Sequence, residues 1–426
     1  MSVIAPTAPH LAPSAAAAPV TVPIDQGSVT FDLPAEWEVH RASINNRPPL
    51  TADQIRTALR ETVGTPALRE LARGRRTAVL IVDDLTRPTP TADFIPYVLE
   101  EIHAGGIPPE RTVILGGFAT HRPMTRPEYV RKVGAEVVAR YEYMNHNPFE
   151  HLTDVGTTSR GTKVAVNKYY ADADLRISLS SVIPHASAGF GGGAKLVLPG
   201  VCSIETIAYH HGTFDGERVQ IEGNVFRADC EEAARLADHD FSVNVVVNRD
   251  MKVAGLFAGD LVAAHRAAVQ LARDLYVVPA APDADLTIVS GHPQDSEFLQ
   301  AGKALGEYGA PATARPDGVV LFAAAATLGF GVHYLGERRR RDLPLGEPGT
   351  GPRASELGDR EIVVYSPGVT QMEAGLRLPG APVFAKPGAA VEAVREAVAR
   401  RRNGRHTPIV NVIPEGPVAI FGNPPA

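Results

Sequence analysis

Short apolar runs that end in aspartate or glycine alternate with helix-like stretches along most of the chain. Residues 77–82, TAVLIV, are one such run, and Asp83 and Asp84 follow it directly. A short, fully apolar segment of this kind is typical of a parallel strand that helices cover on both faces. Comparable runs lie at 112–115, 175–180, 243–247, 286–290, 319–324 and 361–365. The alternation predicts an α/β fold with mostly parallel sheets, in which ligands bind at the carboxyl ends of the strands.

The length and one break in this pattern predict two α/β domains. A chain of 426 residues is too long for one ordinary core. The loop-like residues 277–285, VVPAAPDAD, separate two series of strands, so we place the boundary near residue 280. We expect a disordered extension at 1–19, an N-terminal domain at 20–280 and a C-terminal domain at 281–404. Residues 338–359 are expected to form a long surface loop, and 409–413 and 418–421 to form strands that could pair.

The composition excludes several classes of protein. The 42 basic and 48 acidic residues give a formal charge of −6, which leaves no basic surplus for binding nucleic acid. The one basic cluster, 338–341, is better explained as a solvated surface. Two cysteines, Cys202 and Cys230, exclude a disulfide framework and are typical of a reducing cytoplasm. No apolar run approaches the ~20 residues that span a bilayer, and the N-terminus lacks a signal-peptide pattern, so we expect a soluble cytoplasmic protein.

Polar clusters follow the first two predicted strands. Asp84, Thr86 and Arg87 come after the first strand, and an arginine there suits a carboxylate or phosphate, which it can bind with two hydrogen bonds. A simple helix cap explains this cluster equally well. His121 lies in a turn after the second strand and is a candidate acid or base, because histidine titrates near neutral pH. Taken alone, a surface histidine explains that position at least as well.

The third cluster is a glycine-rich segment, 184–200, that contains a single lysine. It is no P-loop, because Ala194 and Leu196 flank Lys195 where Gly and Ser or Thr are required. The segment formally matches the fingerprint of a dinucleotide-binding fold. That fingerprint should lie at the start of a helix, however, and Pro199 follows too soon after it for a helix to form. We therefore interpret the segment as a loop that offers backbone N–H groups to an anion and places Lys195 beside it. Such a lysine serves as a charge, or as a nucleophile once its pKa is lowered.

The fourth cluster is a pair of adjacent histidines, His210 and His211, on an expected helix. Neighbouring side chains on a helix point in different directions, so one of the two at most faces the site of Lys195. Imidazole is a natural ligand for nickel. Without further histidines or cysteines at ligand spacing, the pair is a poor site for a bare ion and a good one where an organic ligand supplies the other donors.

Together these segments resemble the lactate racemase family, which uses a nickel-pincer nucleotide. The similarity lies in the order and spacing of three motifs: Asp-x-Thr-Arg-Pro at 84–88, Thr-His-Arg-Pro at 120–123 and Pro-His…Gly-Gly-x-Lys-x-x-x-Pro-Gly at 184–200. The resemblance as a whole extends from about residue 25 to the end of the chain. It implies two α/β domains with the active site in the cleft between them. It also implies that the C-terminal segment, 405–426, returns to the first domain.

The resemblance further implies how the cofactor is held. Lys195 carries the pyridinium-3,5-dithiocarboxylate mononucleotide through a covalent thioamide link. His211 coordinates the nickel opposite the pincer carbon, and two cofactor sulfurs complete the plane. The expected cofactor site also contains Thr86 and the three loop glycines Gly191, Gly192 and Gly193.

For the substrate, the resemblance implies an acid/base pair and a carboxylate site. His121 and His185 are the paired acid/base residues, and Asp84 and Arg87 match active-site positions. Arg87, Gln300 and Lys303 are the residues expected to hold the substrate carboxylate.

The implied reaction inverts C2 of a 2-hydroxy acid. Its C2 hydrogen is a poor acid, and hydride transfer to and from the pyridinium carbon avoids a carbanion. The resulting 2-keto acid accepts hydride on its opposite face, so one histidine per face exchanges the hydroxyl proton, while the cofactor carries the difficult step. The implied partners are a small 2-hydroxy acid and the enzymes that make the cofactor.

Two departures from the family's lactate enzymes bear on the substrate. Leu299 stands where those enzymes have a tyrosine, and the single tryptophan, Trp37, is far from their late tryptophan. We therefore expect an acid larger than lactate, and a sugar-acid (aldonate) 2-epimerase is the alternative. A nicotinamide dehydrogenase would need a properly placed fingerprint. A non-catalytic nickel or nucleotide carrier would not need two histidines together with Gln300 and Lys303.

Overall fold

A computed structural model of the chain describes residues 19–306, 309–335, 357–401 and 407–422. Most of the expected N-terminal extension, 1–19, and of the expected surface loop, 338–359, lies outside these ranges. The chain divides into two compact units. Unit 1 comprises Met1–Ile44, Val277–Phe330 and Thr350–Asn423, and unit 2 comprises Asn45–Tyr276, Gly331–Gly349 and Pro424–Ala426. Among the described helices, none is long and apolar enough to cross a membrane.

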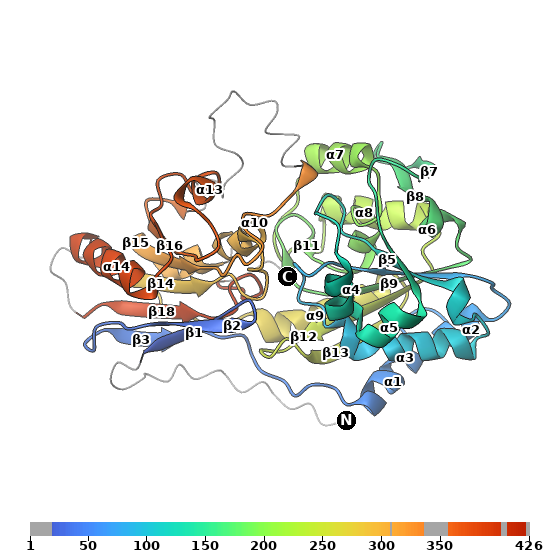
Figure 1. Cartoon of the computed structure of the whole chain (residues 1–426), viewed down its shortest axis with the longest axis horizontal. Coiled ribbons are helices and arrows are strands. Elements are labelled where there is room, and N and C mark those ends of the chain that lie inside the picture. Colours follow the sequence, from blue (N-terminus) through green and yellow to red (C-terminus); the bar gives the residue numbers. More distant parts are fainter. Residues whose placement is uncertain (1–18, 307–308, 336–356, 402–406, 423–426) are drawn as a thin grey trace. The chain divides into compact units, whose positions relative to one another are not determined.

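Unit 2 is built on a six-stranded sheet with the order β13-β12-β9-β4-β5-β6 (Figure 1). β4 (Ala78–Val82) lies inside this sheet, parallel to β5 (Thr112–Gly116) and to β9 (Leu175–Ser181). β6 (Glu142–Asn145) and β12 (Phe241–Val247) continue the parallel order, and β13 (Val253–Gly259) is antiparallel to β12. The predicted α/β fold with largely parallel sheets is therefore confirmed.

Helices cover both faces of this sheet because its strands send alternate apolar side chains to opposite sides. Leu80 and Val82 pack with α1 (Ala52–Arg60), α2 (Leu68–Ala72), α3 (Thr91–Ala104), α4 (Arg126–Val133) and α5 (Ala135–Arg140). Val79 and Ile81 pack with α7 (Ile204–Thr213), α8 (Val225–Leu236) and the hairpin of β7 (Leu152–Thr157) and β8 (Lys163–Asn167). Unit 2 also contains α6 (Lys168–Asp172) and α9 (Ala263–Tyr276).

The order of the strands creates a switch point at β4. The chain runs from β4 outward through β5 and β6, then returns to the other side of β4 to form β9. The loops that leave β4, β5 and β9 therefore start at the same edge of the sheet. Ligands of open parallel sheets bind at such points, and these three loops carry most of the predicted site residues.

Unit 1 contains a second six-stranded sheet, in which all pairings are parallel, with the order β17-β16-β15-β14-β18-β3. Its strands are β3 (Glu38–Arg41), β14 (Ala284–Ser290), β15 (Ala314–Ala323), β16 (Glu361–Tyr365), β17 (Val383–Phe384) and β18 (Ile409–Ile413). The hairpin of β1 (Val20–Ile24) and β2 (Gly27–Phe31) packs into the same apolar core as α14 (Pro387–Arg401). A short helix, α13 (Gln371–Gly375), follows β16.

The expected assignment of the two chain ends to the N-terminal domain is wrong. β18 pairs in parallel with β14, where Leu286 lies opposite Val410, and β3 pairs with the other edge of β18. Hydrogen bonds and apolar packing therefore join both 20–44 and 409–413 to unit 1. The expected pairing of 409–413 with 418–421 is also not found, because β18 is occupied on both sides and Ile420 bridges to Val277.

Candidate functional site

The loop after β4 is organised around the carboxylate of Asp84. One carboxylate oxygen, Oδ1, accepts from the backbone N–H of Thr86 at 2.9 Å and from its hydroxyl at 2.6 Å. The Thr86 hydroxyl in turn accepts from Nη1 of Arg87 at 2.8 Å. Asp84 and Thr86 are buried, and Arg87 is half-buried. The predicted cluster thus forms one polar network, in which Thr86 links the acid to the arginine.

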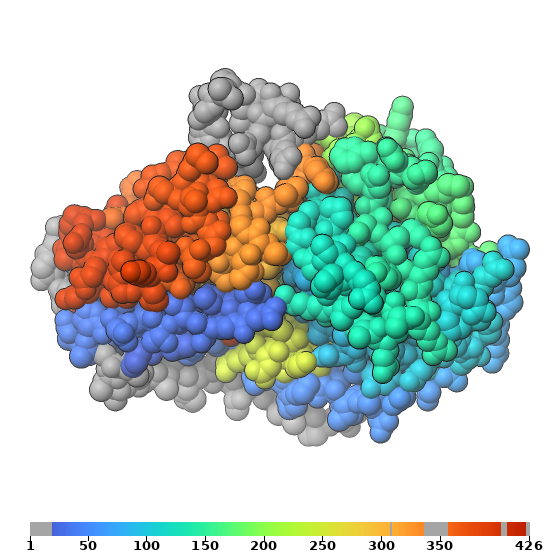
Figure 2. Space-filling model, viewed as in Figure 1, coloured from blue at the N-terminus to red at the C-terminus, as the bar shows by residue number. Residues whose placement is uncertain are grey.

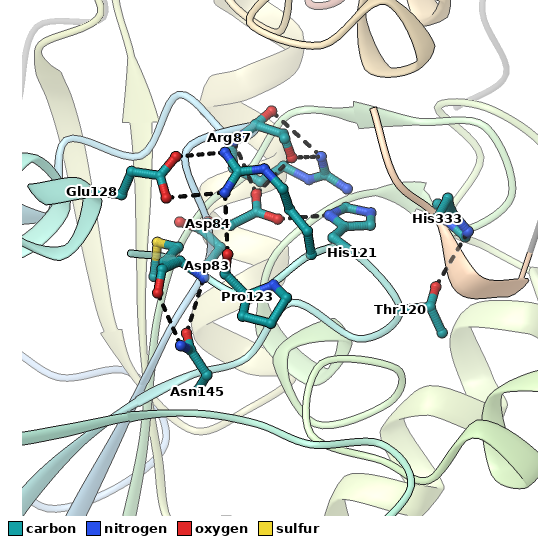
Figure 3. A network of polar contacts seen from close by, with 12 residues as sticks. Asp83, Asp84, Arg87, Thr120, His121, Pro123, Glu128, Asn145 and His333 are labelled. Atoms are coloured by element: carbon teal, nitrogen blue, oxygen red, sulfur yellow. Dashed lines mark hydrogen bonds and ion pairs between the residues drawn. The ribbon is translucent and has the colours of Figure 1, made fainter. Parts of the chain in front are cut away.

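The second oxygen of Asp84, Oδ2, lies 2.7 Å from Nδ1 of His121, which enters from the loop after β5 (Figure 3). Burial alone would raise the pKa of Asp84, but His121, Arg87 and the Thr86 hydroxyl outweigh it and hold the pKa well below its usual range. An ionised carboxylate accepts hydrogen bonds only, so Nδ1 of His121 carries a proton. In the neutral ring, the lone pair is therefore on Nε2. This arrangement prepares His121 to accept a proton at Nε2.

His185 has the opposite arrangement. It belongs to β10 (Pro184–His185), which forms a short hairpin with β11 (Gly189–Phe190). Its Nδ1 accepts from the backbone N–H groups of Ser187 and Ala188, both at 3.2 Å. A backbone N–H can only donate, so the neutral ring of His185 carries its proton on Nε2. The two predicted acid/base residues are thus in opposite tautomers, one ready to accept and the other to donate.

In the glycine-rich loop, the N–H groups of Gly191 and Gly193 do not face an anion as expected, because both donate inside the protein. The N–H of Gly191 donates to the carbonyl of Ile183 at 2.7 Å, and that of Gly193 donates to Oδ1 of Asn244 at 3.0 Å. Both groups are therefore satisfied inside the protein. The carbonyl oxygens of the loop are directed to a positive charge instead.

That charge is Arg227 on α8, whose side chain is fully buried. Its guanidinium donates to the carbonyls of Ala188, Phe190, Gly191 and Gly192 and lies 3.1 Å from Nε2 of His265. Burial lowers the pKa of Arg227 to about 10, which still leaves it charged at neutral pH. Sequence reasoning missed this residue, because an arginine on a helix gives no local sign that it holds a loop distant in sequence.

Two glycines allow this loop to turn tightly into Lys195. Gly192 and Gly193 have φ of +78° and +56°, in the left-handed region that glycine alone adopts at little cost. A Cβ on Gly193 would also lie 3.2 Å from the ring of His265. A single turn of 3₁₀ helix, Gly193–Leu196, follows and carries Lys195. No α-helix opens here, in agreement with the exclusion of a dinucleotide fingerprint.

The amine of Lys195 is buried and, within the described part of the chain, makes no hydrogen bond. The residue as a whole is half-buried, but Nζ itself is covered. Burial, with the nearby charges of Arg227 and Arg87, lowers the pKa of Lys195 to about 8 from 10.5. A buried amine without a hydrogen-bond partner is costly. The lowered pKa makes the neutral form, which a nucleophile requires, far more populated near neutral pH than in an ordinary lysine.

The structure distinguishes between the two adjacent histidines of α7. His210 is fully buried, with Nε2 3.1 Å from the carbonyl of Phe226 and Nδ1 3.3 Å from Nδ1 of His211. His211 lies 3.1 Å through Nδ1 from the carbonyl of Ile207, so its proton is on Nδ1 and its lone pair on Nε2. Burial and the charge of Lys195 lower the pKa of His211 well below its ordinary value. A neutral imidazole with its lone pair on Nε2 is the form that binds a metal.

The aromatic ring of Phe226 joins these groups. Its centroid lies 4.9 Å from Nζ of Lys195 and 4.9 Å from the ring of His211. The rings of His210 and His185 lie 4.1 and 6.4 Å from it. Lys195, His211 and His185 therefore surround one side chain at the start of α8. Phe226 is a second residue that sequence reasoning missed, since a phenylalanine on a helix is ordinarily read as core.

Comparisons with known proteins agree with this geometry. Residues 24–223 match the family model described as the lactate racemase N-terminal domain. The chain is 34% identical over 325 residues to the lactate racemase of Lactiplantibacillus plantarum, an alignment that covers 73% of this chain and 76% of that protein. It is 30% identical over 329 residues to the lactate racemase of Thermoanaerobacterium thermosaccharolyticum, covering 73% and 75%. The chain belongs to the lactate racemase family.

Solved structures support the fold of this family member. The lactate racemase apoprotein from Thermoanaerobacterium thermosaccharolyticum matches with a TM-score of 0.74 at 24% identity, over 95% of this chain and 100% of that one. A crystal structure of a Thermotoga maritima protein matches with a TM-score of 0.63 at 18% identity, over 88% and 99%. Membership of the lactate racemase family confirms the predicted enzyme class, an isomerase.

The other predicted substrate-binding residues of this lactate racemase family member lie in unit 1. Gln300 is buried on the short helix α10 (Phe298–Ala301), and Lys303 is half-buried on the 3₁₀ turn Gly302–Leu305 that follows. Leu299 is half-buried, and its N–H donates to the carbonyl of Phe330 at 2.9 Å. Trp37 packs against the core of unit 1. The roles of Gln300 and Lys303 stay predictions.

One further histidine of unit 2 was not anticipated from the sequence. His333 forms a backbone bridge with His121, and its ring centroid lies 5.2 Å from that of His121. Its Nδ1 is 3.3 Å from the hydroxyl of Thr120 (Figure 3). The two residues are 212 positions apart in the sequence, and no local motif connects them.

Proposed function

We propose that this protein is a racemase or epimerase that inverts C2 of a 2-hydroxy acid with a nickel-pincer nucleotide attached to Lys195. One observation carries the proposal: the buried amine of Lys195, which has no hydrogen-bond partner among the described residues, shares the ring of Phe226 with His211. An unsatisfied buried amine of lowered pKa is poorly explained as a structural group. It is well explained as a site of covalent attachment.

The residues present fit the proposed cofactor. Among the described residues there is no cluster of three or more His, Cys, Asp or Glu that could hold a bare metal ion. A single imidazole, His211, is what a nickel ion needs when an organic ligand supplies the other donors. Lys195 and His211 would hold the group, and Thr86 lies on the neighbouring loop. When bound, the nickel-pincer nucleotide would supply a hydride acceptor and donor.

The rest of the reaction is carried by the protein. His121 takes the hydroxyl proton of one enantiomer at Nε2, and Asp84 orients its ring and stabilises the charge that forms. His185 presents Nε2–H to the substrate oxygen and serves the other enantiomer. Arg87 binds the substrate carboxylate, because arginine is a natural partner of an anion. Gln300 and Lys303 are the substrate-binding residues proposed for unit 1. The hydroxyl of Thr86 hydrogen-bonds to both side chains and so fixes Arg87 relative to Asp84.

The alternatives make different demands on these residues. A non-catalytic carrier of nickel or nucleotide would need Lys195 and His211 but no histidine held by a buried carboxylate. A nicotinamide dehydrogenase would need a fingerprint that opens a helix, and Gly193–Leu196 is a short 3₁₀ turn. A sugar-acid 2-epimerase with the same cofactor differs only in the substrate, and it stays the second candidate because of Leu299.

The proposal is tested by producing the protein together with cofactor-making enzymes. Intact-protein mass spectrometry and nickel analysis should show a covalent adduct with about one nickel per chain. Racemisation of 2-hydroxy acids should appear in the loaded protein and be absent from protein made without those enzymes. A loaded protein that inverts no 2-hydroxy acid would indicate a carrier, and a protein that never loads would overturn the proposal.

The two histidines of α7 allow a matched test of the nickel ligand. We expect His211→Ala to lose nickel while the organic adduct on Lys195 is retained, because only the metal ligand is removed. His210→Gln should keep nickel, since both ring nitrogens of His210 already form hydrogen bonds, to the carbonyl of Phe226 and to His211. The measurement is the ratio of bound nickel to covalent adduct, obtained from elemental analysis and intact-protein mass. Nickel retained in His211→Ala and lost in His210→Gln would reverse the assignment.

The substrate is expected to be larger than lactate. Leu299 lacks the phenol of the family's lactate enzymes, and Trp37 is partly buried and packs against the core of unit 1. An NMR screen of C2-deuterated acids, from lactate through branched, aromatic and sugar acids, should show turnover of a larger acid with most of the label retained. Rapid exchange of the label with solvent would indicate proton abstraction and contradict hydride transfer. A clear preference for lactate would refute the expected size of the substrate.

A further inference from the structure

Lys132 is a buried cation in the last turn of α4, and the proposed mechanism does not use it. Helices α4 and α5 form part of the surface of unit 2 in Figure 2 (teal), yet the side chain of Lys132 turns inward and is only 3% exposed. A lysine is almost never buried to this extent unless it is paired. What surrounds its ammonium therefore indicates why it is there.

Four oxygen atoms of one loop surround this ammonium. Nζ of Lys132 lies 2.5 Å from Oδ1 of Asp83, and it donates to the carbonyl oxygens of Asp84 at 2.9 Å, Thr89 at 3.2 Å and Arg87 at 3.3 Å. All four belong to the segment 83–89 that leaves β4. Asp84 and Arg87, the two charged residues of this loop that the proposed reaction uses, thus have their own carbonyls held by the same cation.

A second set of contacts fixes the two ends of this loop to the sheet. The hydroxyl of Thr89 donates to Oδ2 of Asp83 at 2.5 Å and lies 2.8 Å from the hydroxyl of Ser181 at the end of β9. The N–H of Ser181 donates back to the hydroxyl of Thr89 at 2.9 Å. The loop is therefore closed by Asp83 and Thr89, and Lys132 occupies its interior.

α4 also connects Lys132 to the loop that carries His121. Thr125, four residues after His121, is the N-cap of α4, and Glu128 of the helix accepts from both Thr125 and Arg122. The same helix thus fixes the end of the His121 loop and, one turn later, places Lys132 inside the Asp84 loop. An ion pair that only neutralised Asp83 would require no contact with the three carbonyls.

We propose that Lys132 is a positioning residue, which holds the 83–89 loop so that Asp84 orients His121 and Arg87 keeps its place at the substrate. This inference rests on the proposed function for its effect on the reaction. The geometry of the loop, however, is testable in the protein without cofactor. Lys132 does not touch the substrate in this scheme and acts only through Asp84 and Arg87.

The main test uses Lys132→Met, which keeps the length of the side chain and removes the ammonium. In the cofactor-free protein we expect faster amide hydrogen exchange across 83–89. We also expect a loss of the single Nδ1–H tautomer of His121, read from ¹⁵N chemical shifts. In the loaded enzyme kcat should fall by roughly 10²-fold, because a displacement of about 1 Å costs that much. Adduct formation on Lys195 should be unchanged, because Arg227 holds that loop.

Two further variants separate positioning from simple charge neutralisation. Asp83→Asn/Lys132→Met removes the buried carboxylate that would otherwise be left unpaired, and should recover thermal stability while kcat stays low. Arg131→Met removes an exposed positive charge from the same helix and should match the wild type. Recovery of wild-type kcat in the double variant would overturn the proposal, as would an unchanged tautomer and exchange rate in Lys132→Met. If the wild type inverts no acid while the tautomer of His121 still shifts, the proposed function fails and the positioning role stands.

Discussion

Lys195→Ala should abolish covalent loading and reduce the inversion of a 2-hydroxy acid to the uncatalysed rate, a loss of about 10⁶-fold or more. The reason is that no other amine in the described part of unit 2 combines burial, a pKa of about 8 and the absence of a hydrogen-bond partner. Intact mass after production with the cofactor-making enzymes measures the effect. Lys168→Ala, which removes an exposed lysine of α6, is the control and should load fully.

The same lysine should also influence stability in a pH-dependent way. Its pKa is lower in the folded chain, about 8, than its ordinary value of 10.5, so the charged form is disfavoured by folding. Below pH 8 this costs up to about 3 kcal/mol of the free energy of unfolding, and the cost falls as the pH rises from 8 towards 10.5. Cofactor-free Lys195→Met should therefore be more stable than the wild type at pH 7, and the difference should shrink by pH 9.5.

Denaturant unfolding of the two cofactor-free proteins at pH 7 and 9.5 measures this difference. An adduct mass that persists in Lys195→Ala would disprove the attachment site. A Lys195→Met protein less stable than the wild type at pH 7 would show that the amine makes a favourable interaction. That result would weaken the argument that the amine is kept for reactivity.

The strands could be predicted from the sequence because their signal is local. Apolar runs such as 77–82 and 361–365 match β4 and β16 within one residue. Which sheet a strand joins is a different matter. β18 pairs with β14, more than 120 residues earlier, and no feature of 409–413 identifies that partner. The wrong assignment of both chain ends follows from this lack of long-range information.

The site shows the same division between local and distant information. Asp84, His121 and Lys195 stand beside strand ends or in a glycine-rich loop, so their neighbours in sequence reveal them. Lys132 and Arg227 are ordinary helix residues in the sequence, and their importance lies in the carbonyl oxygens they contact in distant loops. The direction of the glycine-loop N–H groups was likewise not predictable, because it depends on Asn244 and Ile183 across the fold.

His121→Ala and His185→Ala should each reduce inversion by about 10²–10⁴-fold, the usual cost of removing a general acid or base. Each histidine serves one enantiomer, so the loss of either should slow the complete cycle. For a racemisation the two enantiomers have equal free energy, and kcat/KM must therefore be the same in both directions for every variant. The measurement is the initial rate from each pure enantiomer with fully loaded protein. A variant that keeps near-normal rates in both directions would remove its histidine from the mechanism.

The opposite tautomers of the two histidines make this prediction more specific. Asp84→Asn should mimic most of the loss seen in His121→Ala, because an amide no longer enforces the proton on Nδ1. The loss of an orienting carboxylate costs about 10⁴-fold in the serine-protease triad. Combining Asp84→Asn with His121→Ala should add little, since residues that act as one unit are not additive. Combining it with His185→Ala should instead lower the rate beyond either single variant. If the rate losses of the single variants were additive in both double variants, Asp84 would not act through His121, although the two side chains are 2.7 Å apart.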